Sequence, residues 1–309
     1  GTGFVLDAFP PGKDERGEAY VHIVTAYHVV DHATRVMCEF TKRDGDPIQA
    51  ELVVYSAHLD VALLRVRADA GELGVTPLVS GDSDALQPTD EVVAAGFALG
   101  HDYQITSGTV SGRSNLVQVD CAVNGGNSGG PLLDASKRVV GVVVSGYDPG
   151  VAQNINFVSP IFETVACLRW ALGSGVASVP SRSLNVTLVS GSAELYSRDA
   201  CAQAGCPHGG YVTQVHPHSA LHAAGLRRRD VLCSVGGYDL DMRAKVEVEW
   251  WPVDRLDLHT LMERLQLGEE VDVSFWSRRA GAVVRRRVRV EAERDAFRTV
   301  DPLVEPPRY

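Results

Sequence analysis

Short runs in which apolar and polar residues alternate dominate the first half of the chain. A period of two with frequent β-branched residues is typical of half-buried strands, and Gly- or Pro-containing turns separate the runs. Many short strands with such turns predict a mainly β fold, either a barrel or a sandwich. We expect strands at residues 1–6, 20–24, 35–40, 48–56, 61–66, 91–95, 104–110, 117–123, 139–145 and 155–158.

The pattern changes after residue 160. Residues 161–172 place most apolar side chains on one face at helical spacing, which closes a first domain over 1–172. The Gly- and Pro-containing stretch 173–183 is the expected linker, followed by a second domain over 184–291 and a tail over 292–309. In the second domain we expect strands at 209–215, 271–276 and 283–290, a strand and turn at 229–237, and helices at 221–225 and 256–267.

Charge is distributed unevenly along the 309 residues, which carry a formal net charge of −10. Residues 1–180 contain 11 Lys and Arg against 21 Asp and Glu, whereas residues 181–309 contain 18 of each, which supports two domains. The acidic first part argues against nucleic acid as a partner, because phosphate binding needs a basic surface. We interpret the arginine runs at 227–229 and 285–287 as solvated charges rather than a specific anion site, because acids are interleaved with them.

The composition is that of an ordinary globular protein, with 45% hydrophobic and 22% charged residues. No run approaches the roughly 18 apolar residues of a membrane span, so no span is expected. The chain starts at Gly1 rather than Met, so we expect it to be processed or trimmed. The sequence leaves the cellular compartment undetermined.

Six cysteines in a chain of this length are too sparse for a disulfide-rich scaffold. Cys201 and Cys206 lie close together, and a local disulfide or part of a metal site are alternatives to two reduced thiols. We favour the thiols, because the spacing matches no usual zinc pair and a fourth ligand is not evident. We expect no metal and no cofactor. Four nearby histidines are interpreted as exposed turn residues rather than a metal site or pH switch: His208, His216, His218 and His222.

The glycine-rich segment 124–131, Asn-Gly-Gly-Asn-Ser-Gly-Gly-Pro, lies between two apolar stretches and is expected to form a tight loop between strands. Its glycines allow backbone conformations without a Cβ penalty, so successive N–H groups can turn into one concavity. Ser128 would then lie beside an oxyanion hole made by the N–H groups of Gly126 and Ser128. A glycine-rich turn without chemistry is the alternative.

Two upstream residues favour the catalytic interpretation. His28 lies just past a predicted strand, and Asp60 stands immediately before an apolar run, where a charge needs a partner. A serine hydroxyl becomes a nucleophile when an imidazole takes its proton and a carboxylate orients that imidazole. The chain order His, Asp, Ser is that of the chymotrypsin arrangement. We therefore predict His28 as general base and then acid, Asp60 as its orienting carboxylate and Ser128 as the nucleophile.

The motifs around these residues resemble those of the HtrA/Deg serine proteases over most of residues 1–165. The resemblance implies a chymotrypsin-like double β-barrel, with the three residues in the cleft between the barrels. It also implies that Val144, Ser145 and Gly146 pair with the substrate backbone as an added strand. The matching segments are Gly-Thr-Gly-Phe at 1–4, Thr-Ala-Tyr-His-Val-Val at 25–30, Asp-Val-Ala-Leu-Leu at 60–64, Ser-Asp-Ala-Leu at 83–86, Ser-Gly-Thr-Val-Ser at 107–111 and residues 120–131.

Ala122, six residues before Ser128, falls where chymotrypsin-like enzymes line the base of the main specificity pocket. Because it is small and uncharged, a basic substrate side chain would find no counter-ion there. The resemblance implies cleavage after small or medium aliphatic residues in unfolded or extended substrates. Two departures matter. The family commonly has Pro or Arg where Gly125 stands, and the short segment between Ser111 and Leu116 puts regulation by the usual activation loop in doubt.

Residues 184–291 resemble the PDZ domains of the same family. Such a domain binds an extended peptide or C-terminus between a strand and a helix. The segment 238–255 is longer than usual, and its Trp250 and Trp251 are either core residues or an exposed contact patch, of which we favour core. The loop expected to bind the terminal carboxylate lacks the usual glycine and comprises Leu184, Asn185 and Val186.

The sequence thus predicts an HtrA-type serine endopeptidase that cleaves unfolded or misfolded proteins through an acyl-enzyme and carries one PDZ domain. A catalytically silent chaperone or a PDZ peptide-binding scaffold is the alternative, and the complete set of His, Asp and Ser argues against it. A third hypothesis is a proteinase whose PDZ segment only packs against the barrel or builds a homo-oligomer. Separately, the family resemblance implies a possible homo-oligomer, a trimer that relatives commonly form through residues ahead of the protease domain.

Overall fold

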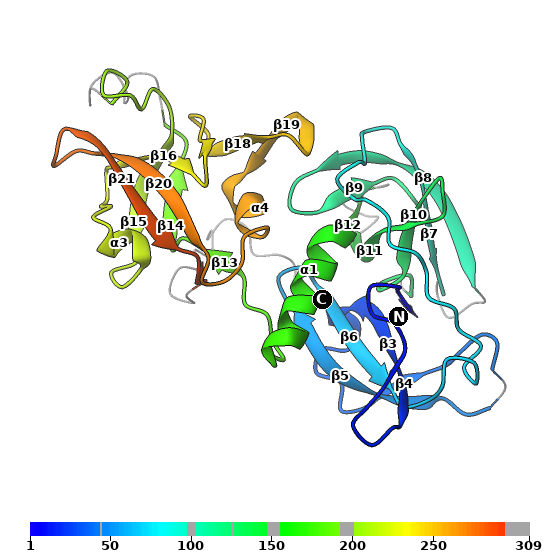
Figure 1. Cartoon of the computed structure of the whole chain (residues 1–309). Helices are drawn as coiled ribbons and strands as arrows, with labels where there is room; N and C mark the ends of the chain where they lie inside the picture. The colour runs from blue at the N-terminus through cyan, green and yellow to red at the C-terminus, as the bar shows by residue number, and fades with distance from the viewer. Residues whose placement is uncertain (44, 98–102, 125, 147–154, 192–200, 294–309) are drawn as a thin grey trace. The chain divides into compact units, whose positions relative to one another are not determined.

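The computed structural model describes residues 1–43, 45–97, 103–124, 126–146, 155–191 and 201–293. Contacts divide the chain into two compact units, Gly1–Pro180 and Ser181–Tyr309, each with hydrophobic clusters of its own. The division falls inside the predicted linker, residues 173–183. Strands dominate both units, which confirms the prediction of a mainly β protein (Figure 1).

The first unit begins with a six-stranded antiparallel sheet. Its strands are β1 (Gly3–Phe4), β2 (Gly12–Lys13), β3 (Ala19–Ala26), β4 (Val36–Cys38), β5 (Ile48–Ser56) and β6 (Val61–Val66). They are ordered β1-β3-β6-β5-β4, with β2 beside β3. The central strands β3 and β6 are buried over most of their length, which explains why the sequence shows apolar runs there. The pattern gives no sign of β2, because two residues are too few for a period.

A closed six-stranded barrel follows. Its strands are β7 (Glu91–Gly96), β8 (Gln104–Arg113), β9 (Val117–Val119), β10 (Pro131–Asp134), β11 (Val139–Gly146) and β12 (Asn156–Pro160). They close in the order β10-β11-β12-β9-β8-β7 around an interior filled mainly by valines. The strand predicted over 117–123 is shorter than expected. The Cys121 carbonyl accepts the Asn156 side-chain amide at 2.6 Å, so the chain leaves the ladder after Val119.

Helix α1 (Ile161–Ser174) ties the sheet to the barrel, close to where the sequence predicts a helix. Its Leu168 lies in one hydrophobic cluster with Val54 of β5 and Val142 of β11. Gly175 ends the helix in a left-handed conformation, with φ at +68°. The first unit is therefore two six-stranded β structures in tandem, joined by a shared core.

The second unit is built on another antiparallel sheet. In order it contains β14 (Val186–Val189), β15 (Gly210–Val215), β16 (Val231–Val235), β20 (Glu270–Ser277) and β21 (Ala282–Arg289), with β17 (Tyr238–Asp239) beside β16. Two further pairs are β13 (Arg182–Ser183) with β22 (Glu291–Ala292), and β18 (Lys245–Val248) with β19 (Trp251–Asp257). The helices are α3 (Ala220–Ala223) and α4 (Leu258–Met262). No helix in the described ranges has the length and apolar character needed to cross a membrane.

The helix predicted over 256–267 is wrong at both ends. It covers Leu258–Met262 only, because Leu256 belongs to β19, where it pairs with Val246 of β18. Trp251 lies in the core with 2% of its surface exposed, which agrees with the interpretation of this tryptophan as a core residue. Trp250 is partly buried, and the Arg264 guanidinium lies over its ring at 3.4 Å from the centroid.

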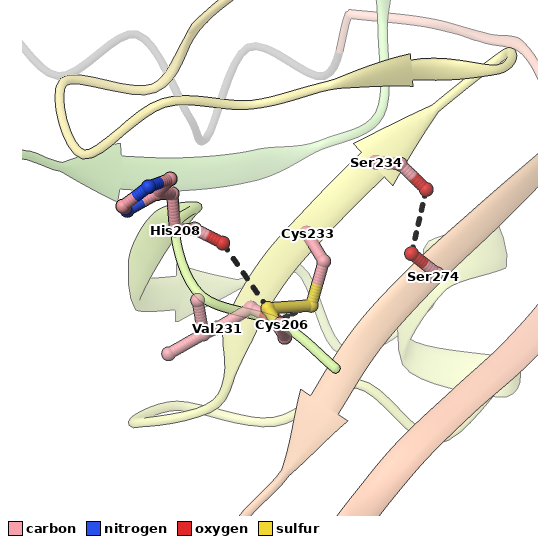
Figure 2. Close-up of a disulfide and its surroundings, with 6 residues drawn as sticks. All are labelled: Cys206, His208, Val231, Cys233, Ser234 and Ser274. Atoms are coloured by element: carbon pink, nitrogen blue, oxygen red, sulfur yellow. Dashed lines mark hydrogen bonds between the residues drawn. A yellow bond between two sulfur atoms is a disulfide. The ribbon is translucent and has the colours of Figure 1, made fainter. Parts of the chain in front are cut away.

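Cysteine pairing is a second correction. Cys206 forms a disulfide with Cys233, 27 residues away, whereas the spacing of Cys201 and Cys206 favoured two reduced thiols (Figure 2). In the β15–β16 ladder Gly210 pairs with Leu232, and this register brings the segment before β15 beside Cys233. The partner of Cys206 thus depends on strand pairing, which local spacing cannot show.

We expect the double variant Cys206→Ala/Cys233→Ala to lose about 3 to 4 kcal/mol of unfolding free energy, because a cross-link no longer restricts the unfolded chain. Urea unfolding of the full chain measures this loss by tryptophan fluorescence, since Trp250, Trp251 and Trp276 all lie in the second unit. Under reducing conditions the wild type should fall to the level of the variant. A wild type that unfolds at the same urea concentration with and without reductant would contradict the prediction.

Candidate active site

His28 and Asp60 are brought together by neighbouring strands of the first sheet. Strand β3 runs into the short helix η1 (Tyr27–Val29), and Asp60 lies in the turn between β5 and β6. The Asp60 carboxylate binds His28 twice. Its Oδ2 lies 2.6 Å from the ring Nδ1, and its Oδ1 accepts the His28 backbone N–H at 2.8 Å. Tyr27 N–H also donates to the Asp60 carbonyl at 3.0 Å, so the ring and the carboxylate are fixed relative to each other.

Asp60 has a left-handed backbone conformation, with φ at +52°. Aspartate tolerates this region better than most residues, because its short polar side chain can bond to nearby groups. Here the turn directs both carboxylate oxygens at His28. The residue type and the backbone conformation are therefore matched at this position.

The carboxylate of Asp60 also influences the charge of His28. Its hydrogen bond to Nδ1 raises the pKa of His28 above the ordinary value of 6.5, while partial burial acts in the opposite direction. With Nδ1–H directed at Asp60, Nε2 of the neutral ring is left as a proton acceptor. His22 on β3 differs, because burial and the charge of Arg65 lower its pKa to about 4.

Backbone hydrogen bonds hold the loop that carries Ser128. The Ser128 carbonyl accepts the Thr2 N–H at 2.8 Å, and Gly129 N–H donates to the Val143 carbonyl of β11 at 2.7 Å. Gly129 has a φ of +84°, and a Cβ atom there would overlap the Thr2 carbonyl and the Thr25 hydroxyl. Glycine is therefore required directly after the serine.

The N–H groups of Gly126 and Ser128 remain available in this loop. Asn127 N–H donates to the Asn124 carbonyl at 3.0 Å, and Gly126 has a φ of +107°. Glycine adopts such a positive φ without the steric penalty that other residues have. Within the described structure neither the Gly126 N–H nor the Ser128 N–H has an acceptor, as an oxyanion-binding pair requires. Gly125, where the family commonly has Pro or Arg, lies outside the described residues.

Ser128 and His28 are connected through the backbone. Thr25, three residues before His28, donates its hydroxyl to the Thr2 carbonyl at 2.7 Å, and the Thr2 N–H reaches the Ser128 carbonyl. In the described part of the structure, the Ser128 hydroxyl makes no hydrogen bond to the His28 ring. Sequence reasoning missed Thr2 and Thr25 as contributors to the site, although both lie in the motifs that carry the resemblance.

Ala122, the predicted base of the specificity pocket, is exposed. Its carbonyl accepts the Thr106 hydroxyl at 2.9 Å, and the preceding Cys121 carbonyl accepts the Asn156 amide at 2.6 Å. These two bonds hold the backbone and leave the Ala122 methyl group accessible.

Strand β11 carries the predicted substrate-pairing residues. The Val144 side chain is buried, so only the backbone of this residue can meet a substrate. Ser145 and Gly146 pair with β12 on one side of the strand. On the other side β10 pairs no further than Val142, so residues 144–146 present an open edge in the described structure.

The predicted carboxylate loop of the second unit comprises Leu184, Asn185 and Val186, which lead into β14. Leu184 is buried in the core of this unit. Asn185 N–H donates to the Ser183 hydroxyl at 2.8 Å, and the Asn185 amide donates to Glu291 at 3.2 Å. A peptide carboxylate would therefore compete with Ser183 for the Asn185 N–H.

Comparison with known proteins shows what the chain is similar to. Residues 1–142 match the family model of the trypsin-like peptidase domain. The chain is 31% identical over 254 residues to a probable periplasmic DegP-like serine endoprotease of Chlamydia trachomatis, and 30% identical over 274 residues to the putative serine protease HhoB of Synechocystis. The chain is similar to serine proteases of the HtrA type. These alignments cover 78% and 79% of the chain but 46% and 64% of the relatives, so the chain spans about half to two thirds of their length.

Solved structures show the same likeness at the level of the fold. The HtrA-type protease AlgW with decapeptide gives a TM-score of 0.67 at 21% identity, covering 90% of this chain and 83% of that one. The serine endoprotease from Yersinia pestis gives 0.62 at 18% identity, covering 94% of this chain and 88% of that one. The trypsin-like fold predicted from the motifs is therefore confirmed.

The bond between His28 and Asp60 predicts a shift in titration. In imidazole NMR spectra His28 should titrate above pH 6.5, and Asp60→Asn should lower its pKa below 6.5, because burial then acts without the carboxylate. Asparagine tolerates the left-handed backbone at this position. His22 is the internal control, with a pKa of about 4 in both proteins. A His28 midpoint that does not move would show that Asp60 does not bind the ring in solution.

Proposed function

We propose that the chain is a serine endopeptidase that cleaves polypeptides through an acyl-enzyme. The observation that carries the proposal is the His28 ring, bound to Asp60 through Nδ1 at 2.6 Å, with Nε2 left to accept a proton. Ser128 lies on a glycine-rich loop that is linked through Thr2 to the strand preceding His28. The names of the relatives, a DegP-like serine endoprotease and the serine protease HhoB, support the same reaction.

Each residue has a defined part in the proposed reaction. His28 Nε2 takes the proton of the Ser128 hydroxyl while Oγ attacks the scissile carbonyl carbon, and Asp60 stabilises the imidazolium that forms. The N–H groups of Gly126 and Ser128 bind the oxyanion of the tetrahedral intermediate. His28 then gives its proton to the leaving amine. The same ring next activates a water that hydrolyses the acyl-enzyme and releases Ser128.

The substrate in this proposal is an extended or unfolded segment. Residues 144–146 offer an open backbone edge, to which a substrate can add as an antiparallel strand. A folded helix or a paired strand has no free N–H and C=O groups for that edge. The small, uncharged Ala122 supports a preference for small or medium aliphatic side chains at the cleaved bond.

We further propose that the second unit is a PDZ-type domain for extended peptides. Strand β14 is the outermost strand of its sheet, so its outer edge is unpaired among the described strands. Val186 and Leu188 on this strand, and Leu258 and Leu265 near α4, are partly buried on one hydrophobic cluster. Because the Asn185 N–H is already bonded, backbone pairing with β14 would supply more of the affinity than capture of a carboxylate.

Ser128→Ala tests the proposed nucleophile. The wild type should degrade an unfolded protein such as casein and react with a fluorophosphonate probe, whereas the variant should do neither, because the adduct forms on Oγ. Ser114→Ala is the matched control. Its hydroxyl bonds to Asn115 in the connection between β8 and β9, and its loss should leave cleavage unchanged.

Two outcomes of that experiment contradict the proposal. Labelling of both proteins would mean that another residue is the nucleophile. Labelling of neither, with both folded, would favour the alternative of a silent chaperone or peptide-binding scaffold.

The peptide site has its own test in the Ser128→Ala protein, in which a bound peptide cannot be cleaved. Fluorescence anisotropy should show similar affinity for a peptide with a free C-terminal carboxylate and for its C-terminal amide, because the β14 edge pairs with backbone groups. A marked preference for the free acid would show that a carboxylate displaces Ser183 from the Asn185 N–H. Binding of neither peptide would contradict the proposed PDZ role.

A further inference from the structure

We propose that Thr2 is a positioning residue of the active site, whose hydroxyl holds the oxyanion loop in its working conformation. The inference rests on the proposed serine-protease function and concerns a residue that takes no part in the chemistry itself. Thr2 is 5% exposed and lies just before β1, far in sequence from the loop that carries Ser128. It nevertheless makes four hydrogen bonds, of which two reach this loop, one reaches β3 and one reaches Phe97 directly after β7.

The hydroxyl of Thr2 acts both as donor and as acceptor. Its hydroxyl donates to the Gly126 carbonyl at 2.7 Å and accepts the Phe97 N–H at 3.0 Å. A hydroxyl has one proton to donate, so the proton of Thr2 is spent on the loop. Because the Phe97 N–H approaches the same oxygen as a donor, the hydroxyl proton cannot point at Phe97.

The backbone of Thr2 adds two further contacts. Its N–H donates to the Ser128 carbonyl at 2.8 Å, and its carbonyl accepts the Thr25 hydroxyl at 2.7 Å. Thr2 is therefore hydrogen-bonded to the loop at Gly126 and at Ser128, on either side of Asn127. Through Thr25 the same residue is anchored to β3, the strand that leads into His28.

These contacts decide how the peptide unit between Gly126 and Asn127 lies. Its carbonyl is held by the Thr2 hydroxyl, and its N–H donates to the Asn124 carbonyl at 3.0 Å. A peptide unit bonded at both ends cannot rotate without breaking two hydrogen bonds. Glycine has access to many backbone conformations, so the turn at Gly126 needs such an external restraint to keep its φ of +107°.

The consequence falls on the two N–H groups proposed for the oxyanion hole. Both must point at one spot, and an error of about 1 Å in such an arrangement can cost on the order of a hundredfold in rate. The space around the Thr2 hydroxyl is tight. A Cβ atom on Gly96 would lie 2.8 Å from the Thr2 Oγ1 and 2.9 Å from the Asn127 Oδ1. The hydroxyl thus sits in a fitted position beside the loop.

Thr2→Val tests the inference, because valine keeps the shape and removes the hydroxyl. We expect kcat on a cleavable peptide to fall about tenfold or more, with KM within about twofold, because the loss falls on the transition state. Inhibition by a peptide aldehyde, which forms a tetrahedral adduct with Ser128, should weaken in the same proportion. Thr2→Ser retains the hydroxyl and should recover most of the activity.

Thr164→Val is the matched control. Thr164 is fully buried in α1, and its hydroxyl lies 3.3 Å from that of Ser159, so the substitution makes the same chemical change away from the loop. It should leave kcat and aldehyde inhibition unchanged even if it lowers the melting temperature. If Thr2 had a purely structural role, both valine variants would show the same change in kcat and in aldehyde inhibition.

Hydrogen exchange keeps the test independent of catalysis. In Thr2→Val the amides of Asn127, Gly129 and Gly130 should exchange faster than in the wild type, and in Thr2→Ser and Thr164→Val they should not. This holds in an inactive protein too, so failure of the proposed function, seen as an unlabelled wild type, is distinct from failure of this inference. If the valine variant does not fold, Thr2→Cys, with its weak S–H donor, takes its place.

Three results would overturn the inference. The first is a folded Thr2→Val variant with the kcat of the wild type. The second is a Thr2→Ser variant whose kcat is as low as that of the valine variant. The third is unchanged exchange of the loop amides when the hydroxyl is removed.

Discussion

The candidate site depends on a close backbone approach between the loop after Ser128 and the first strands of the chain. Gly129 lies so near the Thr2 carbonyl and the Thr25 hydroxyl that no side chain fits there. This approach joins the sheet that supplies His28 and Asp60 to the barrel that supplies Ser128. A single methyl group at Gly129 would push the two β structures apart. Hydrogen bonds across the approach, together with the hydrophobic cluster that the two structures share, therefore set the geometry of the site.

The charged part of the site also depends on a small number of contacts. One carboxylate, Asp60, binds both the ring and the backbone N–H of His28, so it controls the orientation of the imidazole and its protonation together. The unusual φ of Asp60 is what allows both oxygens to face the same residue. A longer acid such as glutamate would place its oxygens beyond the backbone N–H. The residue type, the turn and the raised pKa of His28 are thus parts of one arrangement.

Features that depend on local sequence could be predicted, and features that depend on long-range register could not. The mainly β fold and the three candidate catalytic residues follow from alternation and from short motifs, because each motif occupies a strand end or a turn. The disulfide between Cys206 and Cys233 depends on how β15 pairs with β16, and the short α4 depends on β19 pairing with β18. The role of Thr2 could not be predicted, because a threonine near a strand does not show which carbonyl group, distant in sequence, will accept its hydroxyl.

The two proposed binding sites share one physical principle. Residues 144–146 of β11 and the outer side of β14 are both strand edges without a neighbour in the described sheets. An edge of this kind recognises backbone N–H and C=O groups, which every extended polypeptide carries, so it selects for conformation more than for sequence. Selectivity must then come from the side chains beside each edge, of which the small, uncharged Ala122 is the one proposed for the first site. Under the proposed function, both edges would suit chains that have lost their fold, because folded chains keep their own strands paired.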